Sequence, residues 1–173
     1  DSPAFIAGLK NIPRTGWKMK LNLQDSESVA EHSYMMSVMA MVMADLKNLN
    51  TEKILKMTIL HDWAESKIGD FMPDEITIEK KTELEEYAMT ELLEELPPTI
   101  KDNYFDIWND YKENLSNEAR FVHELDKLEM ALQGKIYEKE TDPEKIKPFL
   151  ISAVEKIADD ELKKILIGIL EKK

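Results

Sequence analysis

The chain has 173 residues, enough for one domain with its own hydrophobic core, and its length gives no reason to expect a second. Hydrophobic residues make up 43% and charged residues 34%, which is the balance of a folded rather than a disordered protein. Cysteine is absent, which excludes disulfides and thiolate metal sites. Any metal must therefore be held by His, Asp, Glu or backbone oxygens.

The formal net charge of −12 makes a surface that repels phosphate backbones, so we expect no nucleic-acid polymer as a partner. A small anionic substrate is still compatible, because a metal ion and a few basic residues can reverse the local field inside a cleft. No apolar run reaches the roughly 18 residues of a membrane span, and the N-terminus lacks the pattern of a secretory signal. We therefore expect a cytoplasmic protein with no membrane partner.

Long stretches rich in Leu, Met, Glu, Lys and Ala favour helices, and only five glycines and seven prolines interrupt them. No alternating apolar and polar run is long enough to predict a strand. We therefore predict an all-α, single-domain bundle over residues 1–173, with an irregular connection over 11–27 and a turn from Gly69 to Pro73. The predicted helices lie near residues 3–10, 29–48, 52–67, 78–96, 98–113, 117–139, 143–157 and 159–171.

Several of these helices begin at side chains that can cap the first free backbone N–H groups. Two of the caps precede a proline at the first helical position, and Ser28 forms a capping box with Glu31. The capping box is a structural explanation for Glu31, which we prefer to a catalytic role. The predicted caps are Ser2, Ser28, Thr51, Ser116 and Asp142.

Two of the three histidines interrupt apolar stripes on predicted helices. His61 falls in a stripe with spacings of three and four residues, formed with Ile54, Met57, Ala64 and Ile68. His32 begins a stripe of methionines that we expect in the core or at a subunit interface, namely Met35, Met36, Met39 and Met43. Taken alone, each histidine could be a core residue satisfied by one hydrogen bond.

Carboxylates near these histidines favour a ligand role. Asp62 follows His61 about 100° round a helix, so both side chains can converge on one ion. Glu65 lies four residues beyond His61, over the same patch. Asp126 stands at the margin of a buried helix face, where a carboxylate must take up a proton or find a cation. A metal shared with Asp62, His61 and His32 would meet that demand.

This set of two imidazoles and two carboxylates suits one divalent ion, which could be Mn²⁺, Co²⁺, Ni²⁺, Fe²⁺, Zn²⁺ or Mg²⁺. On an octahedral ion, four protein ligands leave two positions open for water and a substrate oxygen. The ion would lower the pKa of the water and polarise a phosphoryl group. Glu65 is close but not needed as a ligand, so we predict that it orients or deprotonates that water.

The order His32, His61-Asp62 and Asp126 resembles the H…HD…D signature of the HD-domain metal-dependent phosphohydrolases. Shorter stretches resemble the HD-domain 5′-nucleotidases that act on deoxyribonucleoside monophosphates. The resemblance covers about residues 5–140, and residues 143–171 carry no recognised motif. The stretches that carry it are Arg14-Thr15-Gly16-Trp17, Glu27-Ser28-Val29-Ala30-Glu31-His32, His61-Asp62-Trp63-Ala64-Glu65, Gly69-Asp70 and Leu125-Asp126.

The resemblance implies an α-helical HD fold and the hydrolysis of a nucleoside 5′-monophosphate to a nucleoside and phosphate. It implies that Glu65 acts on the attacking water and that Asp70 lies close to the sugar and the substrate phosphate. It implies that Trp17 packs against the sugar and helps to favour deoxyribose. The metal ligands that it implies are His32, His61, Asp62 and Asp126.

This sequence departs from the resemblance at the phosphate site. Bacterial members place an arginine directly before the tryptophan to bind the phosphate, whereas Gly16 stands there in this chain. Arg14 is the nearest substitute, and Lys18 and Lys20 are alternatives. Trp17 could instead only anchor the irregular segment onto the helices. Three further aromatic or imidazole residues are expected to be flank or packing residues, namely Trp63, Trp108 and His123.

Two other functions stay open at this point. The HD site could act on a cyclic nucleotide, a nucleoside triphosphate or a guanosine alarmone, which an additional His or carboxylate pair for a second metal would favour. The chain could also be a scaffold that binds nucleotide without chemistry, although every ligand position and Glu65 are intact. The Met-rich apolar surface of so short a chain leads us to expect a homodimer.

Overall fold

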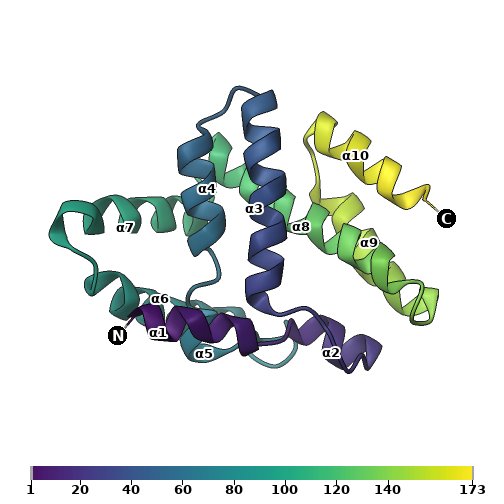
Figure 1. The fold of residues 1–173 in the computed structure, drawn as a ribbon, viewed down its shortest axis with the longest axis horizontal. Helices are drawn as coiled ribbons and strands as arrows, with labels where there is room; N and C mark the ends of the chain where they lie inside the picture. The colour runs from purple at the N-terminus through teal and green to yellow at the C-terminus, as the bar shows by residue number, and fades with distance from the viewer. Residues whose placement is uncertain (1, 173) are drawn as a thin grey trace.

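The computed structural model describes residues 2–172 as a bundle of α-helices (Figure 1). Within these residues the β-type pairing is a single antiparallel bridge between Pro13 and Ser28, so the all-α prediction is confirmed. The elements are α1 (Ser2–Ala7), the 3₁₀-helix η1 (Gly8–Asn11), α2 (Thr15–Leu21), α3 (Val29–Leu46), α4 (Thr51–Leu60), α5 (Glu65–Ile68), α6 (Ile78–Glu94), α7 (Pro98–Glu113), α8 (Asn117–Tyr137), α9 (Pro143–Lys156) and α10 (Asp160–Leu170).

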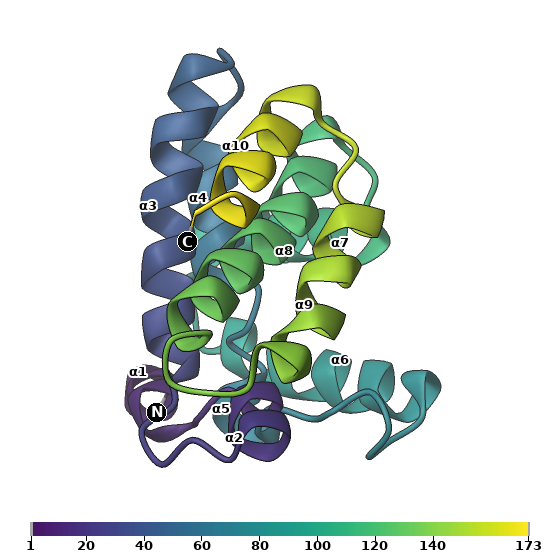
Figure 2. The same cartoon turned by 90° about the vertical axis from the view of Figure 1, so that its right-hand side faces the viewer.

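The core lies where α3, α4 and α8 meet. Figure 1 shows α3 and α4 side by side, and Figure 2 shows α9 and α10 close to α8. One continuous cluster of buried side chains joins these helices, because each helix turns an apolar stripe inward. Its fully buried members include Met36 and Ala40 of α3, Ile54 and Met57 of α4, and Leu125 and Leu128 of α8.

The methionines of α3 divide between core and surface. Met36 and Met43 are buried, as predicted for a core stripe, and Met39 packs against the same cluster. Met35 lies on the exposed side of the helix. The stripe is therefore part of the core for three of its four members.

Local capping chemistry explains most helix starts. Ser28 accepts from the backbone N–H of Glu31, whose side chain accepts from the Ser28 N–H, so the predicted capping box is confirmed. The predicted caps Ser116 and Asp142 are also confirmed. Two cap predictions were wrong. Asn50, one residue before Thr51, caps α4, and Ser2 lies inside α1, where its hydroxyl donates to the carbonyl of Leu92 instead.

The predicted helix over 52–67 is not continuous. It ends at Leu60, a turn occupies 61–64, and a short α5 follows. Through this turn the N–H groups of Trp63 and Glu65 donate to carbonyls three residues back, which winds the chain more tightly than an α-helix. With about three residues per turn, Asp62 and Glu65 share one side of the chain.

The predicted irregular connection over 11–27 was also wrong in part, because it contains α2. The chain enters α2 through a short extended stretch at Ile12–Arg14 that pairs with the stretch before α3. The N–H of Arg14 donates to the carbonyl of Glu27 at 2.9 Å, and the N–H of Val29 donates to that of Ile12 at 2.8 Å. This pairing fixes Arg14 beside the start of α3. Between residues 2 and 172 no helix is long and apolar enough to cross a membrane.

Candidate metal centre and active site

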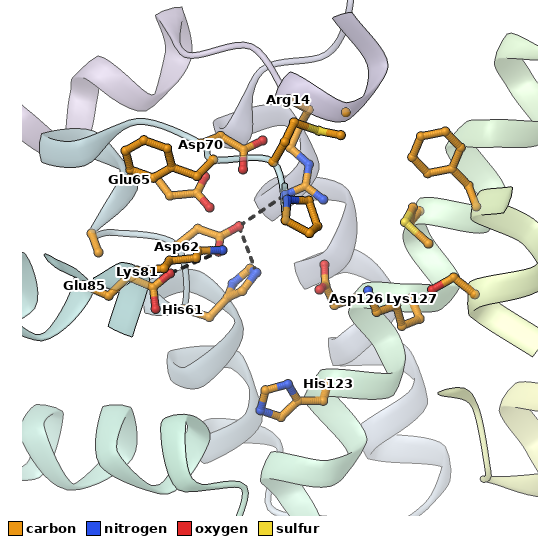
Figure 3. A pocket seen from close by; sticks show the side chains of 18 of the residues that line it. Arg14, His61, Asp62, Glu65, Asp70, Lys81, Glu85, His123, Asp126 and Lys127 are labelled. Atoms are coloured by element: carbon orange, nitrogen blue, oxygen red, sulfur yellow. Dashed lines mark ion pairs between the residues drawn. The ribbon is translucent and has the colours of Figure 1, made fainter. Parts of the chain in front are cut away.

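A pocket of about 660 Å³ opens beside the core, between α2, the loop after α5, and helices α6 to α9 (Figure 3). Its inner end carries charged side chains that approach one another from different elements. In Figure 3, Arg14, His61, Asp62 and Asp126 point into the same space. The predicted site residues Glu65, Asp70 and Trp17 also line the pocket.

The four predicted metal ligands are brought together at this inner end. His32 comes from α3, His61 and Asp62 from the turn after α4, and Asp126 from α8. Donor atoms of His32, His61 and Asp126 all lie within 4.8 Å of one another. The carboxylate oxygen Oδ2 of Asp62 lies 3.0 Å from Nε2 of His61 and 3.9 Å from Nε2 of His32.

Hydrogen bonds on the far side of each imidazole fix which nitrogen faces the pocket. Nδ1 of His61 lies 2.5 Å from the carbonyl oxygen of Thr58, and Nδ1 of His32 lies 2.5 Å from Oε2 of Glu129. A carbonyl and a carboxylate can only accept, so both Nδ1 atoms are donors. In the neutral rings the lone pairs therefore sit on Nε2, aimed at the shared centre, as metal-binding histidines require.

The donor atoms at this centre have no hydrogen-bond partner of their own among the described residues. Nε2 of both histidines, one oxygen each of Asp62 and Asp126, and Oε2 of Glu65 are buried without one. Nε2 of His32 lies only 2.9 Å from Oδ1 of Asp126, yet the two are not aligned for a hydrogen bond. Buried polar atoms left without partners are costly, and a shared cation would satisfy the two imidazole nitrogens and the oxygens of Asp62 and Asp126. The donor set thus fits a divalent metal.

The charges around this centre depend strongly on one another. Burial and the nearby Arg14 lower the pKa of His32, but the adjacent carboxylates of Asp126 and Glu129 outweigh them and raise it to about 10. Burial raises the pKa of Asp62, but His61 and Arg14 outweigh it and lower the value to about 2. Asp62 is therefore an anion, as a ligand must be, while a proton on His32 competes with a metal for Nε2.

Glu65 differs from the other carboxylates of the centre. Burial, followed by the charges of Asp62 and Asp70, raises its pKa well above the usual range. A carboxyl group with a raised pKa binds a proton more readily, as a group that accepts a proton from water must. Because Glu65 is buried beside Asp62 and lines the pocket, its position agrees with the role predicted for it.

Asp70 links the two loops that frame the pocket. Its carboxylate accepts from the backbone N–H of Thr15 at 2.9 Å, and its own carbonyl accepts from the Thr15 hydroxyl at 2.6 Å. Gly69, at φ 80°, supplies the left-handed turn that directs the chain into this position. Asp70 thereby holds the first turn of α2, and with it the adjacent Arg14, against the metal centre.

Arg14 is the basic side chain beside the candidate metal ligands. Its Nη1 lies 3.8 Å from Oδ2 of Asp62, and the carboxylates of Asp126 and Asp62 raise its pKa further against the effect of burial. Of the two alternatives considered for the phosphate, Lys20 lines the pocket whereas Lys18 does not appear in its lining.

Trp17 is largely enclosed, with 2% of its surface exposed. Its indole N–H donates to Oε1 of Glu27 at 3.0 Å, and its ring packs against Tyr137 and Phe149. These contacts support the anchoring role, and the ring still reaches the pocket at its edge. The contact with a sugar stays a prediction.

His123 is more than a flank residue, because it lines the pocket. Its ring stacks on Tyr111 with centroids 4.1 Å apart, and Tyr111 in turn packs edge-on against His61. Trp108, expected to be a packing residue, is buried in the core cluster and also reaches the pocket. Trp63 packs against the core cluster, as expected.

Glu129 and Phe149 are functional candidates that the sequence patterns above do not single out. Glu129 is 1% exposed and holds His32, and it interrupts the buried stripe of α8 much as His61 interrupts that of α4. A glutamate within an apolar stripe of the sequence could therefore have identified Glu129 as a candidate. Phe149 on α9 lines the pocket only because α9 folds back along α8, and no local motif marks it.

Comparison with known proteins extends the resemblance along the chain. The family model described as HD domain matches residues 6–166, which includes α9 and much of α10. A Xenopus laevis protein named 5′-deoxynucleotidase HDDC2 is 37% identical over 98% of this chain and 84% of its own.

Solved structures agree with this match. A conserved hypothetical protein from Pyrococcus furiosus superposes with a TM-score of 0.80 and 27% identity, covering 99% of each chain. A predicted metal-dependent phosphohydrolase from Magnetospirillum magnetotacticum superposes with a TM-score of 0.75 and 26% identity, covering 98% of this chain and 88% of its own. Because the HD-domain family model matches residues 6–166 and the Xenopus laevis relative is 37% identical over 98% of this chain, the chain belongs to the HD-domain family.

Proposed function

We propose that this protein is a metal-dependent phosphohydrolase that removes the 5′-phosphate from deoxynucleoside monophosphates. The observation that carries the proposal is the convergence of His32, His61, Asp62 and Asp126 on one buried centre within a pocket. The Xenopus laevis relative bears the name of a 5′-deoxynucleotidase, and the Magnetospirillum magnetotacticum neighbour that of a metal-dependent phosphohydrolase. Both names agree with a phosphate ester as the substrate.

The four converging residues would hold one divalent ion, with Co²⁺, Mn²⁺, Ni²⁺, Fe²⁺, Zn²⁺ and Mg²⁺ as candidates. When bound, such an ion supplies Lewis acidity toward the phosphoryl oxygens and makes water a stronger acid. Glu129 and the Thr58 carbonyl keep the two imidazoles in the tautomer that the ion needs.

The remaining groups bind the substrate and accept the proton of the attacking water. Arg14 binds the phosphate, because its guanidinium can donate two parallel hydrogen bonds to phosphate oxygens beside Asp62. Oε2 of Glu65 accepts a proton from the water as its oxygen attacks phosphorus. The bond between phosphorus and the 5′-oxygen then breaks, and that oxygen takes a proton from solvent water and leaves as the hydroxyl group of the deoxynucleoside. Glu65 gives the proton that it accepted back to solvent. Asp70 holds Arg14 in place and lies near the sugar, with Trp17 behind it.

The direct test is phosphate release from a panel of deoxynucleoside and ribonucleoside 5′-monophosphates with Co²⁺ or Mn²⁺. We expect turnover of the deoxynucleotides. A folded protein that takes up metal but releases phosphate from none of them would contradict the proposal. A folded protein that takes up no metal on dialysis would favour a scaffold without chemistry.

Two variants separate the roles of ligand and base. We expect Glu65→Gln to keep the metal and to lose about 10²–10⁴-fold in kcat, because only proton transfer is removed. Asp126→Ala should lose both the metal and the activity. Metal content by atomic emission and kcat on one deoxynucleotide measure the two effects. Equal metal loss in both variants would show that Glu65 is a ligand rather than a base.

Three expectations from the sequence stay predictions, namely the cytoplasmic location, the homodimer and the preference for deoxyribose. The deoxyribose preference is tested by the same substrate panel, and the homodimer by the mass of the protein in solution.

A further inference from the structure

We propose that the ring of Phe149, on α9, is the platform on which the base of the nucleotide lies. The inference rests on the proposed function, and it names the residue that recognises the part of the substrate farthest from the reacting bond. It also gives the C-terminal helices a role in the site.

The pocket lining has a charged inner end and, elsewhere, a group of apolar side chains that lies among the polar residues Lys127, Lys145 and Ser152. The candidate metal donors, Glu65 and Arg14 occupy the inner end. Another part of the lining is apolar and comes from three separate elements, with Met72 and Pro73 after α5, Met130 on α8, and Pro148 and Phe149 on α9. A nucleoside monophosphate has the same division, because a dianionic phosphate and a flat, largely apolar base are joined by the sugar. With the phosphate at the metal donors, the apolar wall is a part of the pocket whose chemistry suits the base.

Phe149 is an aromatic side chain of this apolar wall, and its ring is fixed in place. Phe71, before Met72, is another phenyl group in the pocket lining. Phe149 packs against the enclosed Trp17 with ring centroids 4.4 Å apart. The backbone of α2 also lies close, since a Cβ at Gly16 would approach a ring carbon of Phe149 to 3.5 Å. Phe149 is itself only partly buried and lines the pocket. A ring held in this way loses little freedom when a ligand stacks on it.

The chemistry of the wall favours contact with the face of a base. Thioether, proline and phenyl groups offer no strong hydrogen-bond donor or acceptor to a base edge. Every base has a π-face, and stacking on an aromatic side chain is a common way to hold one. The pocket volume of about 660 Å³ lies within the range of small-molecule sites, so a whole nucleotide can be accommodated.

The test compares a substrate that has a base with one that lacks it. The substrates are deoxyadenosine 5′-monophosphate and 2-deoxyribose 5-phosphate, assayed with the Co²⁺-loaded enzyme. We expect Phe149→Ala to lower the ratio of kcat/KM for the first to that for the second by about tenfold. Phe149→Leu, which keeps apolar volume against Trp17 but removes the flat face, should lower the same ratio. Ile151→Ala is the matched control on α9, because Ile151 is 54% exposed and outside the pocket lining.

A measurement on the unaltered protein makes the test independent of whether the variants fold. We expect 2′-deoxyadenosine to inhibit turnover of 2-deoxyribose 5-phosphate at least about tenfold more strongly than 2-deoxyribose does. Equal inhibition, or an unchanged substrate ratio in both Phe149 variants, would overturn the platform while leaving the proposed function intact. Absence of turnover with both substrates would refute the proposed function itself, and the platform with it.

Discussion

The imidazole of His32 is engaged at both of its nitrogens. Nε2 faces Asp126 and Asp62, while Nδ1 donates to Glu129, whose side chain is buried on α8. A carboxylate in this position fixes the ring orientation and makes Nε2 a better ligand. Glu129 would therefore act on a bound metal through His32 rather than by touching it.

Glu129→Gln should weaken metal binding by about 10–100-fold, because the amide keeps the shape but loses the charge that supports His32. The measurement is the Kd for Co²⁺ by titration of metal-free protein. Glu118→Gln is the matched control, since Glu118 lies on the same helix in its first turn. Glu129→Gln should bind Co²⁺ more weakly than Glu118→Gln, while the two variants have similar thermal stability. The same Kd for both would contradict the role of Glu129.

Glu27 gives a prediction about pH. Burial, followed by the charge of Glu129, raises the pKa of Glu27 from 4.5 to about 7. The folded state therefore favours protonated Glu27. The contribution of protonated Glu27 to the free energy of unfolding is fully present below about pH 4.5. It is lost as the pH rises through about 7.

Glu27→Gln removes this dependence and keeps an acceptor for the indole N–H of Trp17. We expect the variant to match the parent near pH 4.5 and to be more stable at pH 8 by up to about 3 kcal/mol, because the pKa of Glu27 is about 7 in the folded protein. Thermal unfolding in the presence of a chelator at the two pH values measures the change. A difference in Tm that is the same at both pH values would show that Glu27 is not the titrating group.

At the scale of elements, the sequence was most informative where structure is set locally. The box at Ser28 and the caps at Ser116 and Asp142 use side chains within three residues of the groups they satisfy. The spacing of three and four residues likewise identified the buried faces that carry His32 and His61. Such short-range interactions can be read from one sequence.

The elements that were predicted wrongly depend on contacts made across the molecule. The turn at 61–64 contains neither glycine nor proline. It brings two candidate ligands, His61 and Asp62, to the centre that also holds Asp126, which lies on a helix far along the chain. Helix α2 is held by Asp70 and by the packing of Trp17 against α8 and α9. The apolar wall at Phe149 arises in the same way. The four donors were predictable as residue types, whereas their supporting groups depended on the packing.

Gly134 tests the contact between α8 and α9. A Cβ at this position would meet Cγ2 of Ile146 at 3.3 Å and the ring of Trp17 at 3.5 Å. Gly134→Val adds methyl groups beyond that Cβ, so we expect a loss of about 1–3 kcal/mol in the free energy of unfolding. Gly168→Val is the control, because a Cβ there meets nothing within 4 Å and the gain in helix propensity is shared. Urea unfolding measures the free energy of unfolding of both variants. Equal values for Gly134→Val and Gly168→Val would contradict a close contact between α8 and α9 at Gly134.

At the scale of the whole molecule, the candidate metal centre joins segments that are far apart in the sequence. The donors come from α3, from the turn after α4, and from α8, which are also the elements that build the core. With a net charge of −12, repulsion between negative side chains destabilises the folded state, and a bound cation reduces that repulsion. The metal should therefore stabilise the fold as well as serve the chemistry.

Metal binding should raise Tm in a way that depends on Asp126. An ion that binds only the folded state stabilises it by about 2.7 kcal/mol when its free concentration is a hundred times its Kd. For a domain of this size, about 2–4 °C per kcal/mol gives an increase of about 5–10 °C over the chelator-treated protein. Asp126→Asn removes one of the four donors, so most of that increase should disappear while the metal-free variant still unfolds cooperatively. An equal increase in the variant would mean that the stabilising ion binds elsewhere, and no increase in the parent protein would contradict the predicted centre.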